Sequence, residues 1–307
     1  MQNILVTGGA GYIGSYFVKK LLNLKFNITV VDNLMFKQNA NFLKKKYSNL
    51  SFITGDVRDE KLMKKIINSN DIIIPLAGIV GAPLADKMQK DTKEINVDSI
   101  KYLTSVCSKD QKIIMPVSNS GYGIGEKNKF CDETSPLRPV SLYGRTKVEA
   151  EKIIMDRENS ISFRLATVFG VSEERMRTDL MVNNFTFCAF KKQKFKLYQP
   201  EFRRNFVHIS DISNAFLFSI EFFSKIKSNI YNLGLNNANI TKIELCKKIK
   251  NYVPDFEFEV SNDEQDPDQR DYFVSNKKIN EAGYNAVYSL DDGIKELIKY
   301  YTDNFKN

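Results

Sequence analysis

The sequence predicts an α/β fold with a doubly wound parallel sheet and a smaller C-terminal α/β lobe. Short apolar runs rich in β-branched residues alternate with amphipathic helical patterns up to about residue 170. This alternation is typical of parallel strands joined by right-handed helical crossovers. Beyond that point the rhythm breaks, and helical patterns mix with short strands. We therefore expect a first domain over residues 1–170 and a second lobe over residues 171–307, with some strands and helices of the second part crossing back.

The first domain is expected to contain strands and helices in strict alternation. The strands are short and apolar, and they are Asn3–Thr7, Asn27–Asp32, Leu50–Thr54, Asp71–Leu76, Lys112–Val117 and Ile161–Leu165. The helices carry apolar residues along one face, and they are Tyr12–Leu24, Asp59–Ile67, Asp91–Cys107 and Ser141–Asn159.

The second lobe is expected to pack on the carboxyl edge of the sheet. Its helices are Thr178–Lys192, Ser210–Phe223, Thr241–Asn251 and Leu290–Phe305, and its strands are Phe195–Tyr198, Asn229–Leu233 and Phe256–Val260. Open α/β sheets bind ligands beyond the carboxyl ends of their strands, so the site is expected in the cleft between the two parts.

Composition indicates an ordinary globular protein. The chain has 307 residues, of which 42% are hydrophobic and 27% charged, so it can bury a sizeable core. No apolar run approaches the roughly 18 residues that span a bilayer, and the first residues lack a signal-peptide pattern. We therefore expect a cytoplasmic protein with no membrane partner.

Composition and residue spacing also exclude two ligand classes, metal ions and nucleic acids. The four cysteines are far apart in the sequence and His208 is the only histidine, so no metal site is expected. The net charge of +8 comes from lysines dispersed over the polar faces of the expected helices. This pattern indicates a solvated surface without a nucleic-acid partner, and a modest attraction for an anionic substrate.

A glycine-rich loop follows the first expected strand. Gly8, Gly11 and Gly14 lie where the strand turns into the helix that begins with Tyr12 and Ile13. Gly8 permits a tight turn, Gly11 permits a phosphate to approach the backbone, and Gly14 permits close helix–strand packing. The helix N-terminus then presents unpaired N–H groups to a pyrophosphate. Because the spacing is G-x-x-G-x-x-G and not G-x-G-x-x-G, a strand–helix turn without a ligand is the alternative.

The end of the second expected strand indicates which dinucleotide binds. Asp32 follows the glycines by about 20 residues, where a carboxylate accepts hydrogen bonds from the adenosine ribose hydroxyls and repels a 2′-phosphate. Asn33 comes next, with no arginine in the following few residues. The sequence therefore predicts NAD and not NADP. The alternative is that Asp32 only starts the next turn.

Two later strand ends agree with a bound dinucleotide. Asp56 and Val57 follow the third expected strand, where an acidic acceptor would lie near the adenine amino group. Leu76, Ala77 and Gly78 end the fourth strand, where the cofactor must pass close to the chain. Each of these segments is also compatible with ordinary turn chemistry.

A phenol and an ammonium one helical turn apart form the expected reacting end. Ser141 opens a helix, on which Tyr143 and Lys147 fall at positions i and i+4 of one face. Lowering the pKa of a phenol from about 10 to 7 requires roughly 4 kcal/mol. A positive charge about 4 Å away supplies approximately that much at an effective dielectric of 20. We therefore expect Lys147, reinforced by an oxidised nicotinamide, to let Tyr143 remove a proton from a substrate hydroxyl as hydride leaves the same carbon.

A hydroxyl at the end of the fifth expected strand completes this set. Ser118 is placed to hydrogen-bond the reacting oxygen and to bridge it to Tyr143, with Asn119 and Ser120 beside it as substrate-binding candidates. In isolation, Tyr143 and Lys147 would read as a surface pair on an amphipathic helix. With a nucleotide loop upstream and Ser118 at a strand end, the catalytic interpretation is favoured.

Together these residues resemble the extended short-chain dehydrogenase/reductases of the nucleotide-sugar epimerase and dehydratase family, which have a Rossmann fold. The resemblance covers nearly the whole chain, and it implies that Ser118, Tyr143 and Lys147 form the catalytic set. Its motifs are Thr7–Gly14, Asp32-Asn33, Asp56, Asn96-Val97, Ser118 to Gly123, Tyr143 to Lys147, Arg204–His208 with Asp211, and Tyr231–Gly234.

A longer shared pattern is similar to NAD-dependent GDP-manno-heptose C4 dehydrogenases. It comprises residues 74–83, Asn119–Lys127 and Asp266–Tyr272. This resemblance implies oxidation of GDP-D-glycero-D-manno-heptose to its 4-keto form in capsular polysaccharide biosynthesis. A redox-neutral 4-epimerase acting on a UDP-hexose and a non-catalytic dinucleotide sensor are the alternatives.

The chain also departs from the family pattern. Nucleotide-sugar 4,6-dehydratases carry an Asp-Glu pair directly after the catalytic hydroxyl residue, whereas this chain has Asn119 and Ser120. Without a carboxylic acid there, elimination of water lacks its acid and base. The arginine often found ahead of Arg270 is replaced by Asp263–Gln265.

The remaining substrate contacts follow from the need to hold a diphosphate. Arginine matches phosphate geometry, so Arg204 and Arg270 are the first candidates, and the resemblance adds Arg175, Arg177, Asp179, Leu180 and Asn183. Surface salt bridges are the alternative for several of them. His208 is expected to have a structural role beside Asp211. The resemblance further implies a homodimer or tetramer in which Asp91–Cys107 and Ser141–Asn159 pair as a four-helix bundle.

Overall fold

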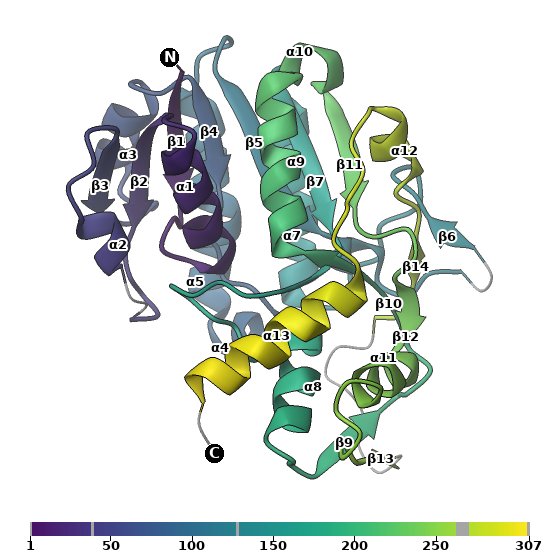
Figure 1. Ribbon diagram of the computed structural model, residues 1–307. Coiled ribbons are helices and arrows are strands. Elements are labelled where there is room, and N and C mark those ends of the chain that lie inside the picture. The colour runs from purple at the N-terminus through teal and green to yellow at the C-terminus, as the bar shows by residue number, and fades with distance from the viewer. Residues whose placement is uncertain (1, 38–39, 127–128, 262–269, 306–307) are drawn as a thin grey trace.

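A parallel sheet of seven strands lies at the centre of the protein (Figure 1). The computed structural model describes residues 2–37, 40–126, 129–261 and 270–305. In spatial order the strands are β11 (Asn229–Leu233), β7 (Ser160–Leu165), β5 (Lys112–Ser118), β4 (Ile72–Pro75), β1 (Asn3–Thr7), β2 (Asn27–Asp32) and β3 (Leu50–Thr54). The strands expected in the first domain are all present, with ends shifted by no more than one residue. The predicted doubly wound α/β fold is confirmed.

Helices cover both faces of this sheet. Those of the first part are α1 (Tyr12–Asn23), α2 (Asn41–Lys44), α3 (Glu60–Ile67), α4 (Ala82–Lys87), α5 (Gln89–Lys93), η1 (Glu94–Asp98), α6 (Ser99–Val106), η2 (Asn119–Tyr122) and α7 (Leu142–Met155). Those of the later part are α8 (Met181–Phe190), α9 (Ile209–Glu221), α10 (Phe223–Ile226), α11 (Lys242–Lys250), α12 (Lys277–Glu281) and α13 (Leu290–Asn304). None of these helices, within the ranges that the structure describes, is long and apolar enough to cross a bilayer.

The period-2 alternation of strand side chains gives each face of the sheet its own core. Ile4 and Val6 of β1 point to one face, where they pack with α1 and α9. Leu5 points to the other face, where it packs with α3, α6 and α7. All three side chains are fully buried. Figure 1 shows α1 and α9 in front of the sheet. Because both faces are covered, the strands read as continuous apolar runs.

The strand order reverses between β1 and β4. From β1 the chain proceeds outward through β2 and β3, then returns to β4 on the other side of β1 and continues through β5, β7 and β11. The two central strands are paired in parallel, with Thr7 opposite Pro75 at their carboxyl ends. Such a switch point opens a crevice in which doubly wound proteins bind their ligands.

Residues 171–307 divide between the sheet and a separate lobe. The strand Asn229–Leu233 pairs in parallel with β7 and extends the central sheet, and α9 packs on α1 against the same sheet. This corrects the expectation that Asn229–Leu233 belongs to the lobe. Its five residues look like any short strand in the sequence, and only the pairing with β7 places it.

The lobe has a core of its own and lies below the carboxyl ends of the strands in Figure 1. Helices α8, α11 and α13 supply most of that core. Its short strands are β8 (Thr167–Phe169), β9 (Phe195–Tyr198), β10 (Arg203–His208), β12 (Asn239–Thr241) and β13 (Phe258–Ser261), and β6 (Phe130–Cys131) pairs with β14 (Phe273–Val274) beside it.

The helix expected over Asp91–Cys107 is interrupted in its middle. It consists of α5, the wider π-helical turn η1, and α6. A π-helical turn carries one extra residue per turn and is common at functional sites. Here it contains Asn96, whose side chain faces the sheet and is almost completely buried.

Candidate active site

The glycine loop joins β1 to α1 at the switch point. Gly8 has φ +69° and sits so close to β4 that an added Cβ would lie 2.6 Å from the backbone nitrogen of Ala77. An added Cβ at Gly14 would lie 2.2 Å from the Gly8 carbonyl oxygen. At Gly11 the same atom would meet only that carbonyl, at 3.1 Å. The loop is therefore compact on its inner side and open at Gly11, as a closely approaching phosphate requires.

A groove runs from this loop across the carboxyl ends of the strands. It is lined by the end of β2, by the segments that follow β1, β2, β3 and β4, and by one residue of η1, namely Gly8, Gly11, Val31, Asp32, Asn33, Met35, Phe36, Gly55, Val57, Leu76, Ala77, Gly78, Ile79 and Ile95. Eight of the residues predicted to bind the cofactor are in this set. Glycine backbone at one end and small residues along the floor fit an extended dinucleotide.

Asp32 connects the end of β2 to the glycine loop. Its carboxylate accepts hydrogen bonds from the backbone N–H groups of Ala10, at 3.0 Å, and Leu34, at 2.8 Å. Burial raises the pKa of this carboxyl, and the two backbone donors oppose that effect. Asp32 thus shapes the loop as well as lining the groove.

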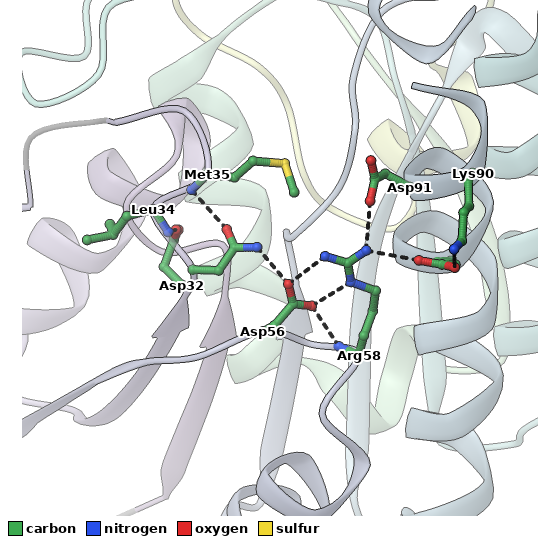
Figure 2. Close-up of polar contacts among 9 residues, drawn as sticks. Asp32, Leu34, Met35, Asp56, Arg58, Lys90 and Asp91 are labelled. Carbon is green, nitrogen blue, oxygen red and sulfur yellow. Dashed lines mark hydrogen bonds and ion pairs between the residues drawn. The ribbon is translucent and has the colours of Figure 1, made fainter. Parts of the chain in front are cut away.

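Asp56 is already saturated with donors from the protein. Figure 2 shows the Arg58 side chain beside its carboxylate. One oxygen accepts from the backbone N–H and Nε of Arg58, both at 2.9 Å, and the other accepts from Arg58 Nη2 at 2.8 Å and Asn33 Nδ2 at 2.9 Å. A carboxylate offers about four acceptor sites. All four are used within the protein, so the adenine contact predicted for Asp56 requires one of these donors to be displaced, and it stays a prediction.

Arg58 extends this network to the helices beside the groove. Its Nη1 donates to Asp91 at 2.7 Å and to Glu94 at 2.9 Å, so one guanidinium connects the β3–α3 segment with α5 and η1 (Figure 2). Hydrogen bonds from Arg58 lower the pKa of Asp56 to about 2. Arg58 escaped the sequence analysis, because nothing in its local sequence shows that three carboxylates converge on it.

The three catalytic candidates come together at the reacting end of the groove. Ser141 caps α7 by accepting a hydrogen bond from the Gly144 backbone N–H at 3.1 Å, which fixes where the helix begins. Tyr143 then lies in the first turn of α7, where the Ser118 hydroxyl at the end of β5 opposes the rise that burial causes in the pKa of its phenol. The bridge through the reacting oxygen stays a prediction.

Lys147 lies one turn further along α7, against the end of β4. An added Cβ at Gly78 would lie 3.3 Å from its Nζ and 3.1 Å from Asn96 Oδ1, so both side chains need the glycine. The Asn96 amide accepts from the backbone N–H of Ile79 at 2.8 Å and donates to its carbonyl at 2.9 Å. The π-helical turn thereby holds the floor of the groove in place beside Lys147.

The electrostatics of this pair differ from the expectation. Burial raises the pKa of the Tyr143 phenol, and the largest opposing effects come from the Ser118 hydrogen bond and the positive charges of Arg270 and Arg177. Burial also lowers the pKa of Lys147 to about 8. Both charged forms lie in the same low-dielectric pocket and both are penalised. The expectation that Lys147, reinforced by an oxidised nicotinamide, activates the phenol omitted the cost of burying both groups, and it stays a prediction.

Asn119 and Ser120 follow Ser118 in the short helical turn η2. Both side chains are only 1% exposed. Neither the Asn119 amide nor the Ser120 hydroxyl has a hydrogen-bond partner among the residues that the structure describes. Buried polar groups without partners are rare and often mark a ligand site.

Arg177 reaches the site from the segment before α8. Its charge acts on both Tyr143 and Tyr12, and its Nε and Nη2 each donate to the Asp179 carboxylate at 2.6 Å. Asp179 also experiences the charge of Arg175. Leu180 is the residue directly before α8. Of these second-lobe candidates, Arg177 thus acts on the phenol, and Asp179 is bonded to Arg177.

Tyr12 and Asn183 form a joint between the two parts of the protein. The Tyr12 hydroxyl donates to the Gly170 carbonyl at 2.6 Å, and the fully buried Asn183 amide contacts Tyr12, both backbone groups of Gly170, and the Arg177 carbonyl. These side chains are used within the protein, so any contact of Tyr12 with cofactor comes from its backbone. Ile13 packs against the sheet core. The sequence could not separate backbone from side-chain roles at the helix N-terminus.

Arg204 supports Arg270 from behind. The Arg204 side chain is fully buried, and its Nη1 donates to the backbone carbonyls of Arg203 and Arg270. Its guanidinium also lies over the Tyr272 ring. A side chain with no exposed surface does not reach a diphosphate, so Arg204 differs from the direct contact expected of it. The segments Asp263–Gln265, Asp266–Gln269 and Lys127 lie outside the described residues.

His208 has the structural role predicted for it, with a different partner. Its Nε2 is hydrogen-bonded to Glu296 at 2.8 Å, its Nδ1 accepts from the Ser210 backbone N–H, and its ring stacks on Tyr288. The Asp211 carboxylate instead accepts hydrogen bonds from the backbone N–H groups of Val287 and Tyr288. The histidine connects β10 to α13 and takes no part in the groove.

Comparison with known sequences identifies relatives over the whole chain. Residues 4–234 match the sequence model of the NAD dependent epimerase/dehydratase family. The dTDP-D-glucose 4,6-dehydratase of Homo sapiens is 25% identical over 329 residues, covering 100% of this chain and 91% of the relative. The UDP-glucose 4-epimerase of Lactobacillus helveticus is 26% identical over 274 residues, covering 81% and 82%.

Solved structures share the architecture. The UDP-glucose 4-epimerase of Thermotoga maritima, solved with UDP-glucose, has a TM-score of 0.85 at 24% identity, covering 99% of this chain and 100% of that one. The dTDP-glucose 4,6-dehydratase of Bacillus anthracis, solved with NAD, has a TM-score of 0.85 at 24% identity, covering 99% and 97%. At this identity the likeness establishes the fold.

Proposed function

The chain belongs to the NAD-dependent epimerase/dehydratase family, and on that basis we propose that it oxidises a nucleotide-activated sugar at C4. NAD is the cofactor of this family, and the groove from Gly11 to Gly78 has the open glycine end and the small-residue floor that fit it. The NAD supplies the acceptor for the hydride that leaves C4. The 4-keto sugar is the product.

The observation that carries this proposal is the placement of the Ser118 hydroxyl near the Tyr143 phenol, with Lys147 one helical turn further along α7. A sugar hydroxyl placed between the two hydroxyl groups gives its proton to the Tyr143 oxygen, while Ser118 holds the sugar oxygen in position. Arg270 and Arg177 favour the phenolate that must form first. Lys147 lies where its ammonium adds to that effect while it remains protonated.

Elimination of water is not part of the proposed reaction. The buried positions directly after Ser118 hold the amide of Asn119 and the hydroxyl of Ser120. Neither group has a pKa that suits it to transfer protons to and from a sugar carbon near neutral pH. Their unpartnered polar atoms are suited to hydrogen-bonding sugar hydroxyls.

The proposed substrate is GDP-D-glycero-D-manno-heptose, as a precursor of capsular polysaccharide in the cytoplasm. The support is the shared pattern over residues 74–83, Asn119–Lys127 and Asp266–Tyr272. We assign the diphosphate to Arg177 and Arg270, because these two guanidinium groups act on the Tyr143 phenol from the second lobe. Arg175, Asp179 and Leu180 complete the proposed nucleotide side of the cleft.

A redox-neutral 4-epimerase is the second candidate. The Lactobacillus helveticus relative is a UDP-glucose 4-epimerase. Epimerisation needs the same three residues, followed by return of the hydride to the opposite face of the keto sugar. The difference is whether the 4-keto sugar leaves before that return.

Product analysis tests the proposal. The purified protein with NAD is incubated with GDP-D-glycero-D-manno-heptose, and separately with UDP-glucose, and the sugars are followed by NMR and mass spectrometry. A 4-keto product two mass units lighter than GDP-heptose, with NADH formed, supports oxidation. An isomer of unchanged mass with inverted C4 supports the epimerase. No reaction with either sugar would leave only a non-catalytic dinucleotide sensor and overturn the enzymatic assignment.

The proposed assembly is a homodimer or tetramer through helices α6 and α7. These helices lie side by side on one face of the sheet, and Lys101 of α6 pairs with Glu149 of α7 at 3.0 Å on their exposed surface. Light scattering of the eluted protein measures the assembly directly, and a mass of one chain would contradict it.

A further inference from the structure

A buried polar chain ties the helix that carries Tyr143 to the turn that follows Ser118. On α7, the residues Tyr143, Lys147 and Glu151 occur at successive i+4 positions. They therefore form one line along the same face of the helix. The first two belong to the proposed catalytic set, whereas nothing above assigns Glu151 a role. Its carboxylate is 3% exposed and points away from the groove, toward β7.

Glu151 is paired with Arg164 of β7 deep inside the protein. Arg164 Nη2 donates to Glu151 Oε1 at 2.7 Å, and Nε donates to Oε2 at 3.0 Å. The side chains are 4% and 5% exposed. Ser162, on the same strand, donates to Glu151 Oε2 at 3.1 Å. This two-point geometry restricts the position of α7 along the sheet more than a single contact would.

The remaining guanidinium nitrogen continues the chain to the catalytic turn. Arg164 Nη1 donates to the Tyr122 hydroxyl at 3.1 Å. That hydroxyl has two acceptors for its one proton, Asn232 Oδ1 at 2.7 Å and the Asp132 carbonyl at 2.9 Å. Tyr122 is the last residue of η2, the turn that starts directly after Ser118.

Close backbone packing completes the coupling. An added Cβ at Gly121 would lie 2.9 Å from the Val148 side chain of α7, and one at Gly144 would lie 3.1 Å from the Ser120 carbonyl. The turn and the helix therefore pack directly on each other. Any shift of one relative to the other changes the distance between Ser118 and Tyr143.

We infer that Glu151, Arg164 and Tyr122 are positioning residues that set the Ser118–Tyr143 geometry for hydride transfer. None of them touches the reacting atoms. They act because a proton-transfer pair needs heavy atoms held within a few tenths of an ångström, and only a directional, buried network provides this across two secondary-structure elements. The expected kinetic effect rests on the proposed function, whereas the expected structural effect rests on geometry alone.

Tyr122→Phe tests it with the smallest change, since only the linking hydroxyl is removed and the ion pair of Glu151 and Arg164 remains. The matched control is Tyr284→Phe, which deletes a buried hydroxyl that donates to the Asp211 carbonyl at 2.6 Å, far along the chain from the site. Tyr122→Phe loses the bond from Arg164 and one that its hydroxyl donates, whereas Tyr284→Phe loses one donated bond, so both are expected to lose stability and Tyr122→Phe somewhat more.

The readouts are single-turnover NADH formation, NAD affinity, and the isotope effect with sugar deuterated at C4. We expect Tyr122→Phe to slow hydride transfer about tenfold, with NAD affinity within about twofold and a larger isotope effect. Tyr284→Phe is expected to leave all three unchanged. Equal kinetic effects in the two variants, or none in Tyr122→Phe, would overturn the inference and leave the network a purely structural one.

A second variant and a second measurement keep the test independent of activity. Glu151→Gln removes the charge but keeps the shape, with Glu281→Gln, which changes an exposed carboxylate of α12 that pairs with Lys277, as control. In protein labelled with 13Cζ-tyrosine, the Tyr143 signal, assigned through Tyr143→Phe, reports the position of the phenol relative to Ser118. It is expected to shift in Tyr122→Phe and Glu151→Gln and in neither control. If wild-type protein transfers no hydride, the proposed function fails, and an unshifted Tyr143 signal would separately overturn the positioning role.

Discussion

The Ser118 hydroxyl, at the end of β5, lies near the Tyr143 phenol, in the first turn of α7, and opposes the rise that burial causes in the pKa of that phenol. The two residues are 25 positions apart in the sequence. Ser118 ends a strand of the sheet, and Tyr143 lies in a helix that covers the sheet. Their placement defines where a sugar hydroxyl must sit if its carbon is to lose a hydride toward the groove.

Removing the phenolic oxygen is therefore expected to stop the chemistry and spare cofactor binding. Tyr143→Phe should slow hydride transfer by about 10²- to 10⁴-fold, since that is what a positioned acid–base group contributes. Rapid-mixing absorbance of NADH measures the rate, and titration with NAD measures the affinity. Tyr252→Phe, which removes a hydroxyl bonded to Asp291 in the second lobe, serves as control. A Tyr143→Phe variant with at least half the wild-type rate would contradict the assigned role.

Lys147→Met is expected to raise stability at neutral pH. The folded-state pKa of Lys147, about 8, lies below the unfolded value near 10.5, so the unfolded chain binds more protons between these values and stability rises with pH across that window. At pH 7 the buried ammonium costs on the order of 3 kcal/mol. Urea unfolding should show this gain at pH 7 and its disappearance near pH 10.5. Equal destabilisation at both pH values would refute the burial argument. Activity is expected to fall all the same.

Asn119→Ala is expected to impair sugar binding without weakening the fold. Its amide makes no hydrogen bond within the described residues, so folding loses little when it is removed. We expect kcat/KM for the sugar to fall about tenfold, with NAD affinity unchanged. Asn70→Ala is the matched contrast, because that buried amide donates to the Ile66 carbonyl at 2.8 Å. It should lose about 1–2 kcal/mol of stability and keep its kinetics. The reverse pattern would show that Asn119 is structural.

Arg58→Met is expected to loosen the adenosine end of the groove. Without the guanidinium, Asp56, Asp91 and Glu94 are left close together with no shared counter-charge (Figure 2). NAD affinity should fall about tenfold. Lys90→Met, which removes a mostly exposed partner of Glu94, is the control and should change nothing.

The same variant has a defined pH signature. The pKa of Asp56, about 2 when folded, lies below its unfolded value near 3.8, so its stabilising contribution is complete above pH 4 and is lost as pH falls toward 2. The stability difference between wild type and Arg58→Met should therefore shrink over that range in urea unfolding. A difference that stays constant down to pH 2 would mean that Arg58 acts without Asp56.

Much of the fold could be predicted from local pattern. The strands of the first domain are buried on both faces, so their apolar runs are unbroken and their ends are visible to within a residue. The glycine loop and the Tyr143–Lys147 pair are equally local, since a turn and an i+4 spacing fix them. Asp32 could be placed for the same reason, because it terminates such a strand.

What could not be predicted depends on contacts between distant segments. The Arg58 cluster draws on three separate elements, and the burial of Arg204 is visible only once Arg270 lies across it. The strand Asn229–Leu233 looks like any lobe strand until it pairs with β7. The raised pKa of Tyr143 follows from the depth of the pocket, which spacing along a helix does not reveal.

The most direct test of the account is a single-turnover experiment with NAD-loaded protein and GDP-D-glycero-D-manno-heptose carrying deuterium at C4. The account predicts NADH absorbance that appears more slowly with the deuterated sugar than with the protiated one, and that is abolished in Tyr143→Phe. Absorbance that forms at the same rate with both sugars would place hydride loss at another carbon. No absorbance with GDP-, UDP- or dTDP-sugars would contradict the account altogether.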